Sequence, residues 1–273
     1  VFFSLLIVAF VIWRKRKMQS TQNKGEEVQT RQQIPPAMID VTSAIGQAQT
    51  NACANVGQIN TFIRTVDLNT FLQTHNKEFF VKQFEGLPET LNVTSKVGLK
   101  HFDKKKYRND EIVPYDYSRV HLEINTEVNE GDYINASYVK GYKESENFIA
   151  SQDPNIAMVN DFIRMLWEQQ VEKVVMLTNL MEYAETQCER YWPEEGEKEF
   201  GGIKVKLTTT QVCTDFTIRR LELRKINTKV QHVTQFHFTS WPDTGVPKTP
   251  WSFVDFEQRV AAEPTEKPIV VHC

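Results

Sequence analysis

A histidine and a cysteine that follow a short apolar run are the residues best suited to chemistry in this sequence. The run Pro268-Ile269-Val270-Val271 precedes His272-Cys273 and is typical of a strand that is buried on both faces of a sheet. The thiol then lies just beyond the carboxyl end of that strand, where open α/β sheets bind their ligands. Taken alone, these six residues leave two interpretations open: a nucleophile, which must act as the thiolate, or an inert, half-buried cysteine.

A carboxylate in a loop is the second candidate for chemistry. Asp243 lies between Pro242 and Gly245, directly after the aromatic Trp241 and Pro242. Between a rigid proline and a hinge-like glycine, such a carboxylate can swing over a site and act as a general acid. The same Pro-Asp-x-Gly pattern also forms ordinary turns, so the loop alone does not decide between acid and turn.

The composition is that of an ordinary globular protein. The 273 residues are 40% hydrophobic and 25% charged, and the formal net charge of −3 gives no reason to expect a nucleic-acid partner. Four cysteines are too few for a disulfide framework in a chain of this length, and no Cys-x-x-Cys or His-x-x-x-His pair indicates a metal site. We therefore expect reduced thiols and neither a metal nor another cofactor.

The amino-terminal residues predict a membrane anchor. Residues 1–13 are apolar apart from Ser4, and the basic run Arg14-Lys15-Arg16-Lys17 follows at once. Thirteen helical residues span about 20 Å, which is less than the ~30 Å of the hydrocarbon core. A signal peptide would carry its positive charge before the apolar run. The pattern favours the distal part of a single transmembrane helix over a buried core helix, and it places the remaining chain in the cytoplasm.

The rest of the sequence divides into a linker and one domain. Residues 14–62 begin with the basic cluster and continue as a polar, mostly unstructured juxtamembrane linker. Residues 63–273 are predicted to form the domain. Asp67 and Asn76 are expected to cap two short helices near its start, and the apolar faces of these helices are expected to pack in a core.

Strand and helix patterns alternate after residue 110 and predict a mixed-sheet α/β or α+β domain. Thr249 is expected to cap a helix that has Pro250 in its first turn. Strands are expected at residues 133–139, 148–150, 174–177, 205–210, 216–223, 233–238 and 269–271, and a further helix at residues 160–170.

Several long motifs, in a fixed order, resemble the catalytic domain of receptor-type protein tyrosine phosphatases. They lie at residues 115–120, 132–137, 161–168, 176–180, 188–193, 235–247 and 270–273. The resemblance covers the chain from about Asp67 to its end. It implies a fold in which helices flank a twisted mixed β-sheet. It also implies that the domain hydrolyses phosphotyrosine in proteins without a metal or cofactor.

The resemblance also implies roles for individual residues. Cys273 would attack phosphorus and form a cysteinyl-phosphate, and Asp243 would protonate the leaving tyrosine oxygen and then assist the hydrolytic water. Tyr107 matches the aromatic wall that sets the depth of the pocket. His272 matches the histidine that tunes the thiolate, and Glu182 matches the carboxylate that orients the phosphate-binding arginine. Trp241, Pro242 and Gly245 would support the acid loop as hinge or core residues.

Four departures from the family pattern favour a slow or specialised enzyme. Asp153 stands where the family has glycine, and aspartate tolerates a positive φ better than most residues do, if that position needs one. An ungapped alignment would replace Tyr107 by Asn109 at the pocket wall. The departures are the insertion Asp110-Glu111, Asp153 for glycine, Ile163 for tryptophan and Gln187 for lysine. They leave a catalytically weak phosphotyrosine-binding or regulatory domain as the alternative.

The last departure is the end of the sequence at Cys273. The family continues with Ser-Ala-Gly-x-Gly-Arg, whose backbone N–H groups and arginine hold the phosphate. Electrostatic stabilisation of the transferred group is usually the largest catalytic contribution. We therefore expect a domain that is truncated at its carboxyl end, an inactive fragment as written, and an active parent protein.

Overall fold

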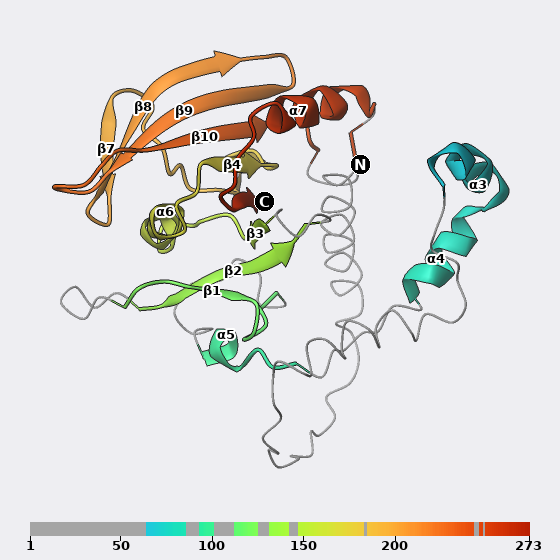
Figure 1. Ribbon diagram of the computed structural model, residues 1–273, viewed down its shortest axis with the longest axis horizontal. Coiled ribbons are helices and arrows are strands. Elements are labelled where there is room, and N and C mark those ends of the chain that lie inside the picture. Colours follow the sequence, from blue (N-terminus) through green and yellow to red (C-terminus); the bar gives the residue numbers. More distant parts are fainter. Residues whose placement is uncertain are drawn as a thin grey trace, which may run out of the picture. The chain divides into compact units, whose positions relative to one another are not determined.

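The computed structural model describes residues 64–85, 93–100, 112–124, 131–141, 147–182, 185–242, 246–247 and 249–273 (Figure 1). They belong to two compact units, one formed by residues 27–93 and the other containing residues 94–273. The predicted membrane segment and linker, residues 1–62, lie outside the described residues. No helix in the described part of the chain has the length and apolar character that crossing a membrane requires.

A nine-stranded mixed sheet forms the framework of the larger unit. Its strand order is β1-β2-β3-β11-β4-β10-β9-β8-β7. The four central strands, β3, β11, β4 and β10, are parallel, whereas the flanking pairs are antiparallel, which confirms the predicted mixed sheet. The strands are β1 (Arg119–His121), β2 (Tyr133–Lys140), β3 (Asn147–Ser151), β4 (Lys173–Met176), β7 (Glu197–Phe200), β8 (Ile203–Val212), β9 (Phe216–Arg224), β10 (Gln231–Phe238) and β11 (Ile269–His272). A separate small hairpin joins β5 (Met181–Glu182) to β6 (Glu185–Thr186).

Helices cover both faces of the sheet (Figure 1). On one face, α6 (Val159–Glu168) packs Phe162 into the same apolar cluster as Val270 of β11. On the other face, α7 (Trp251–Ala261) packs Phe256 into a second cluster with Val271. Successive side chains of a strand point to opposite faces, so β11 is buried on both sides. This confirms the strand that was predicted before Cys273. The short helix α5 (Lys96–Lys100) completes the described helices of this unit.

All seven predicted strands are present, with ends within two residues of those expected. The helix predicted at residues 160–170 is α6, which also begins and ends within two residues of the prediction. The strands β1, β5, β6 and β7 were not predicted, and β7 illustrates the reason. Three of its four residues are charged and exposed, so they carry no apolar pattern. They form a strand because β8 supplies the antiparallel partner.

Two of the three predicted helix caps are wrong. Asp67 precedes α3 (Leu68–Thr74) without a side-chain cap, because its carboxylate binds the Arg64 guanidinium instead, with Nε and Oδ2 2.5 Å apart. Pro250 takes the cap position of α7 without a side-chain hydrogen bond, so the helix begins one residue later than expected. Asn76 is confirmed at α4 (Lys77–Glu85), where its Oδ1 accepts from the Phe79 N–H at 3.0 Å.

The helices α3 and α4 belong to the smaller unit, whose described part begins near the 3₁₀ turn η1 (Thr65–Asp67). Rings of Phe71, Phe79 and Phe80 contact one another at centroid distances of 5.4 to 6.2 Å. Neither α3 nor α4 contains a buried residue. The predicted core face is therefore wrong for these helices, whose apolar side chains contact each other while they remain partly exposed.

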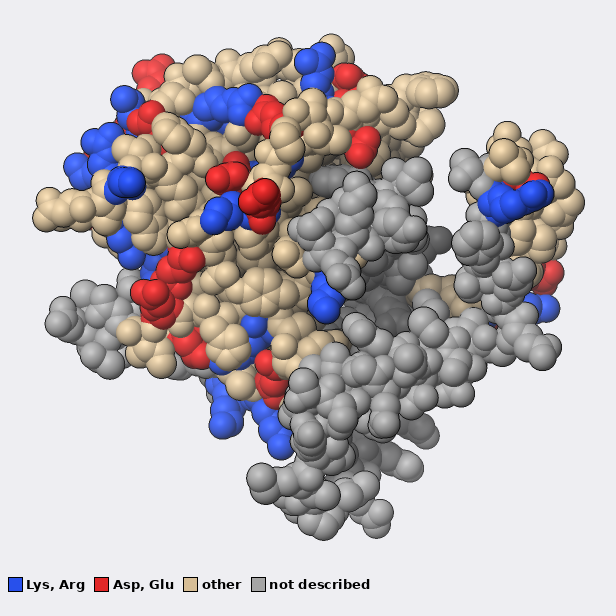
Figure 2. Space-filling view, viewed as in Figure 1, with Lys and Arg blue, Asp and Glu red and all other residues tan. Residues whose placement is uncertain are grey.

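On the face of the molecule seen in Figure 2, acidic and basic side chains are interspersed. Neither sign of charge dominates this face, which agrees with the small net charge of the sequence.

His237 gives the fold a defined sensitivity to acid. This histidine of β10 is buried, its Nε2 donates to the Thr178 carbonyl at 2.8 Å, and Arg219 Nη1 lies 3.3 Å from its Nδ1. Burial, together with the positive charge of Arg219, lowers the pKa of His237 from 6.5 to about 4. The folded protein therefore keeps this imidazole neutral at pH values where the unfolded chain protonates it.

We expect this difference to destabilise the fold in acid. The stabilisation is complete above pH 6.5, the unfolded pKa, and it is lost as the pH falls from 6.5 towards 4, because the unfolded chain then binds an extra proton. The loss amounts to about 3 kcal/mol at pH 4. Urea unfolding at several pH values should show that His237→Gln removes this part of the pH dependence. An unchanged dependence in the variant would contradict the assignment.

Candidate active site

The carboxyl ends of the four parallel strands meet at one edge of the sheet. Asp153 follows β3, Thr178 follows β4, Trp241 follows β10 and Cys273 follows β11. The register aligns them, because His272 is paired with both Ser151 and Met176. The sheet thus brings together segments that are far apart in the sequence, at the edge where such folds bind ligands.

The backbone around Cys273 is held by both neighbouring strands. The Leu177 N–H donates to the His272 carbonyl at 3.1 Å, and the Asp153 N–H donates to the Cys273 carbonyl at 3.2 Å. Cys273 itself is partly buried beside the apolar cluster that α7 covers. Its position is therefore fixed by the extension of the strand ladder past β11, while its thiol stays at the edge of the sheet.

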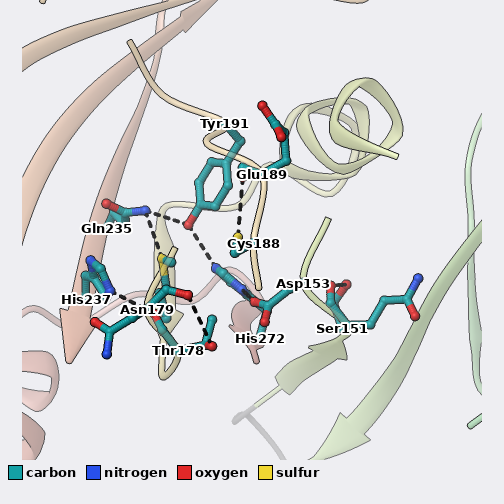
Figure 3. A network of polar contacts seen from close by, with 12 residues as sticks. Ser151, Asp153, Thr178, Asn179, Cys188, Glu189, Tyr191, Gln235, His237 and His272 are labelled. Atoms are coloured by element: carbon teal, nitrogen blue, oxygen red, sulfur yellow. Dashed lines mark hydrogen bonds and ion pairs between the residues drawn. The ribbon is translucent and has the colours of Figure 1, made fainter. Parts of the chain in front are cut away.

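A buried polar network includes His272, the residue directly before Cys273 (Figure 3). His272 is 0% exposed, and its Nδ1 lies 2.5 Å from Oδ1 of Asp153, which is 1% exposed. Its Nε2 lies 2.9 Å from the Tyr191 hydroxyl, which accepts a hydrogen bond from Gln235 Nε2 at 2.6 Å. Burial raises the pKa of Tyr191 well above its ordinary value, and the neighbouring Cys188 adds to this shift. Tyr191 therefore keeps its proton and acts as a hydroxyl.

Asp153, Tyr191 and Gln235 were not among the predicted site residues. The replacement of the family glycine by Asp153 was the one signal in the sequence. Asp153 is not among the described residues with positive φ, which are Gln170, Asn227 and three glycines. The condition under which aspartate would strain the backbone is therefore not met, and the carboxylate instead binds His272.

The network also brings together three groups that can bind metals. Ligand atoms of Asp153, Cys188 and His272 all lie within 4.8 Å of one another. However, Nδ1 of His272 and Oδ1 of Asp153 are only 2.5 Å apart, whereas two ligands of a tetrahedral zinc ion lie about 3.3 Å apart. The geometry is that of a hydrogen-bonded pair.

An open hollow of about 730 Å³ lies at the opposite edge of the sheet, and Lys173, at the start of β4, is among its lining residues. The Nζ of Lys173 donates to the carbonyls of Val260 and Glu263, so its buried charge is hydrogen-bonded within the fold. The hollow is remote from Cys273 and has no part in the candidate site.

Comparison with known proteins identifies the family of this site. Residues 103–273 match the model of the protein-tyrosine phosphatase family. The chain belongs to this family. Human receptor-type tyrosine-protein phosphatase alpha is 42% identical over 215 residues, which are 76% of this chain and 27% of that protein. Human receptor-type tyrosine-protein phosphatase C is 37% identical over 225 residues, 77% of this chain and 17% of that protein. The chain thus spans less than a third of the length of either relative.

The structure describes part of the phosphatase motifs near the predicted acid. Trp241 is buried against Phe238 and Phe253, with ring centroids 6.3 and 5.5 Å away, which agrees with a core or hinge residue. Pro242 is exposed, so the chain leaves the core directly before the predicted acid. Ile163, which replaces the family tryptophan, is fully buried in α6.

Other predicted phosphatase residues lie where the structure gives less detail. Asp243, Gly245, Tyr107 and Asp110-Glu111 are outside the described residues, and the structure describes the backbone of Glu182 in β5 but not its side chain. Their roles stay predictions. Gln187, which replaces the family lysine, donates its backbone N–H to the Leu180 carbonyl at 2.8 Å beside the small hairpin.

Proposed function

We propose that this phosphatase hydrolyses phosphotyrosine in proteins, with Cys273 as the nucleophile. The observation that carries the proposal is the place of Cys273: it directly follows the central strand β11, at the carboxyl edge of the parallel strands, within the segment that matches the family. The thiol lies beside a fully buried histidine whose two ring nitrogens are both hydrogen-bonded. This setting supports a role of Cys273 as a nucleophile over the role of a structural cysteine.

The proposed reaction has two steps. The Cys273 thiolate attacks phosphorus, and the sulfur–phosphorus bond forms as the bond from phosphorus to the tyrosine oxygen breaks. Asp243 donates its proton to that oxygen, so that tyrosine leaves as the neutral phenol. In the second step a water molecule attacks phosphorus, Asp243 takes its proton, and the thiolate leaves with inorganic phosphate as the product. In this proposal Tyr107 sets the pocket depth and Glu182 orients the phosphate-binding arginine.

We propose in addition that the domain works on the cytoplasmic side of a membrane, attached through one transmembrane helix that includes residues 1–13. The apolar run with four cations after it supports this proposal, as does the receptor-type name of the relatives. Its partners would then be phosphotyrosine-containing proteins at the membrane surface.

The acid role of Asp243 provides the test of the proposed function. In the full-length protein, Asp243→Asn should lower kcat for a phosphotyrosine peptide by about 10²- to 10⁴-fold. The loss of kcat/KM, which covers the reaction only as far as departure of the leaving group, should be much smaller for an aryl phosphate with an acidic leaving group, because that oxygen needs no proton in order to leave. Steady-state kinetics with both substrates measure the two losses.

Asp255→Asn is the matched control for this experiment. Asp255 is an exposed carboxylate on α7, 3.8 Å from Arg259, and its loss should leave both rates unchanged. Equal kcat values for Asp243→Asn and the unmodified protein would refute the acid role. If the unmodified protein binds the phosphopeptide but does not hydrolyse it, the alternative of a binding or regulatory domain is the correct one.

A further inference from the structure

We propose that Asp153 is a positioning residue, which holds His272 in the tautomer that has its proton on Nδ1 and thereby fixes the end of the strand that presents Cys273. The expected effect of this positioning on kcat rests on the proposed function of Cys273 as the nucleophile. The tautomer itself follows from the hydrogen bonds of the buried network alone, whatever reaction the site performs.

The direction of each hydrogen bond follows from a guanidinium at one end of the network. Arg219 can only donate, and its Nη1 lies 2.9 Å from Gln235 Oε1. This orients the amide, so that Gln235 Nε2 must donate to the Tyr191 oxygen at 2.6 Å. The Tyr191 hydroxyl keeps its own proton, and His272 Nε2, 2.9 Å away, is placed to accept it.

The tautomer of His272 follows from this order. Nε2 accepts a hydrogen bond and therefore carries no proton, so the neutral ring has its proton on Nδ1. Nδ1–H then donates to Asp153 Oδ1 at 2.5 Å. The hydrogen bonds thus run from Arg219 through Gln235, Tyr191 and His272, and the carboxylate of Asp153 is the final acceptor.

Packing holds the ring in one orientation. The ring of Phe162 lies edge-on to the imidazole with the centroids 5.2 Å apart, and the ring of Tyr191 lies 5.4 Å away. The titratable groups that face His272 include Asp153, Tyr191 and the Cys188 thiol, whose sulfur is within 4.8 Å of the histidine and carboxylate ligand atoms. His237 of β10 also interacts electrostatically with His272. The ring therefore has defined partners at both nitrogens and no exposure to water.

Asp153 contacts both of the last two residues of the strand end. Its side chain binds the His272 ring, and its backbone N–H donates to the Cys273 carbonyl at 3.2 Å. A substitution at this position keeps the backbone contact and removes only the carboxylate. The effect of the carboxylate can therefore be measured separately from the position of the backbone.

The first experiment measures the tautomer directly. In the full-length protein labelled with ¹⁵N-histidine, the His272 ring signals are those that disappear in His272→Gln. At neutral pH we expect Nδ1 to have the chemical shift of a protonated nitrogen and Nε2 that of an unprotonated one. The reverse assignment would overturn the proposal. This experiment needs neither phosphatase activity nor an Asp153 variant, so it separates a failure of the proposal from a failure of the proposed function.

The second experiment compares Asp153→Ala with Asp153→Asn. Alanine removes the acceptor, so we expect the ring signals to shift towards the Nε2–H tautomer and kcat to fall about 10- to 100-fold, with KM changed less than about twofold. Asparagine keeps an acceptor oxygen and should restore the Nδ1–H signals and most of kcat. If both variants lose kcat equally, or if alanine leaves the ring signals unchanged, Asp153 is only a structural residue.

Discussion

Cys273→Ser is expected to abolish phosphotyrosine hydrolysis, with kcat lowered by at least about 10⁴-fold. A serine hydroxyl in the same place is not ionised near neutral pH, and the mechanism includes no base that would activate it. The substitution changes one atom at a position that is only partly buried, directly after β11, so the fold should be retained. Initial rates with a phosphotyrosine peptide in the full-length protein measure the loss.

Trapping of the intermediate adds a second measurement. After rapid acid quench, the unmodified protein should carry phosphate bound to Cys273, and Cys273→Ser should carry none. Cys213→Ser is the matched control, because Cys213 is partly buried in the turn between β8 and β9 and lies far along the chain from the strand end. That variant should keep kcat within about twofold, because the substitution changes a single atom at a partly buried position that has no role in the mechanism. A phosphorylated Cys213, or hydrolysis that persists in Cys273→Ser, would show that another group is the nucleophile.

The sheet was predictable from the sequence because β4 and β11 at its centre contain continuous apolar runs. Val270 and Val271 face opposite apolar clusters, and a pair of adjacent β-branched residues is what such a position requires. The strand β7, in contrast, consists mainly of charged residues, and only its pairing with β8 makes it a strand. The cap at Asp67 failed for a related reason, since Arg64 binds the carboxylate that the helix would have used.

The candidate site was predictable only where its residues are close in the sequence. His272 and Cys273 are neighbours, and the buried strand before them places both. Asp153 is 119 residues from His272, and only the register of β3 with β11 brings the two side chains together. The sequence marked Asp153 as unusual, because it replaces a glycine of a motif. It did not show that His272 is the partner of this carboxylate, because the pairing depends on how the strands are arranged in the sheet.

The position of the histidine also depends on α6, which covers the face of the sheet behind it. Phe162 of this helix contacts the His272 ring. The same helix contains Arg164, whose side chain is 3% exposed. Its guanidinium lies 3.0 Å from Asp161 Oδ1 and 3.6 Å from Glu168 Oε1, and it donates to the Glu123 carbonyl at 2.5 Å. The ion pairs of Arg164 with these two largely buried carboxylates therefore stabilise the helix that packs against His272.

Arg164→Met is expected to lower the free energy of unfolding by about 3–5 kcal/mol, because it leaves the carboxylates of Asp161 and Glu168 buried without their cation. Burial already raises the pKa of Glu168, and the charge of Arg164 opposes that shift. Urea unfolding at neutral pH measures the loss, and adding Glu168→Gln to Arg164→Met should recover part of it by removing one of the uncompensated charges.

Arg259→Met is the matched control, since Arg259 forms an exposed pair with Asp255 and its loss should cost less than about 1 kcal/mol. Equal losses for the two arginine variants would show that burial of the Arg164 ion pairs does not stabilise the helix behind His272.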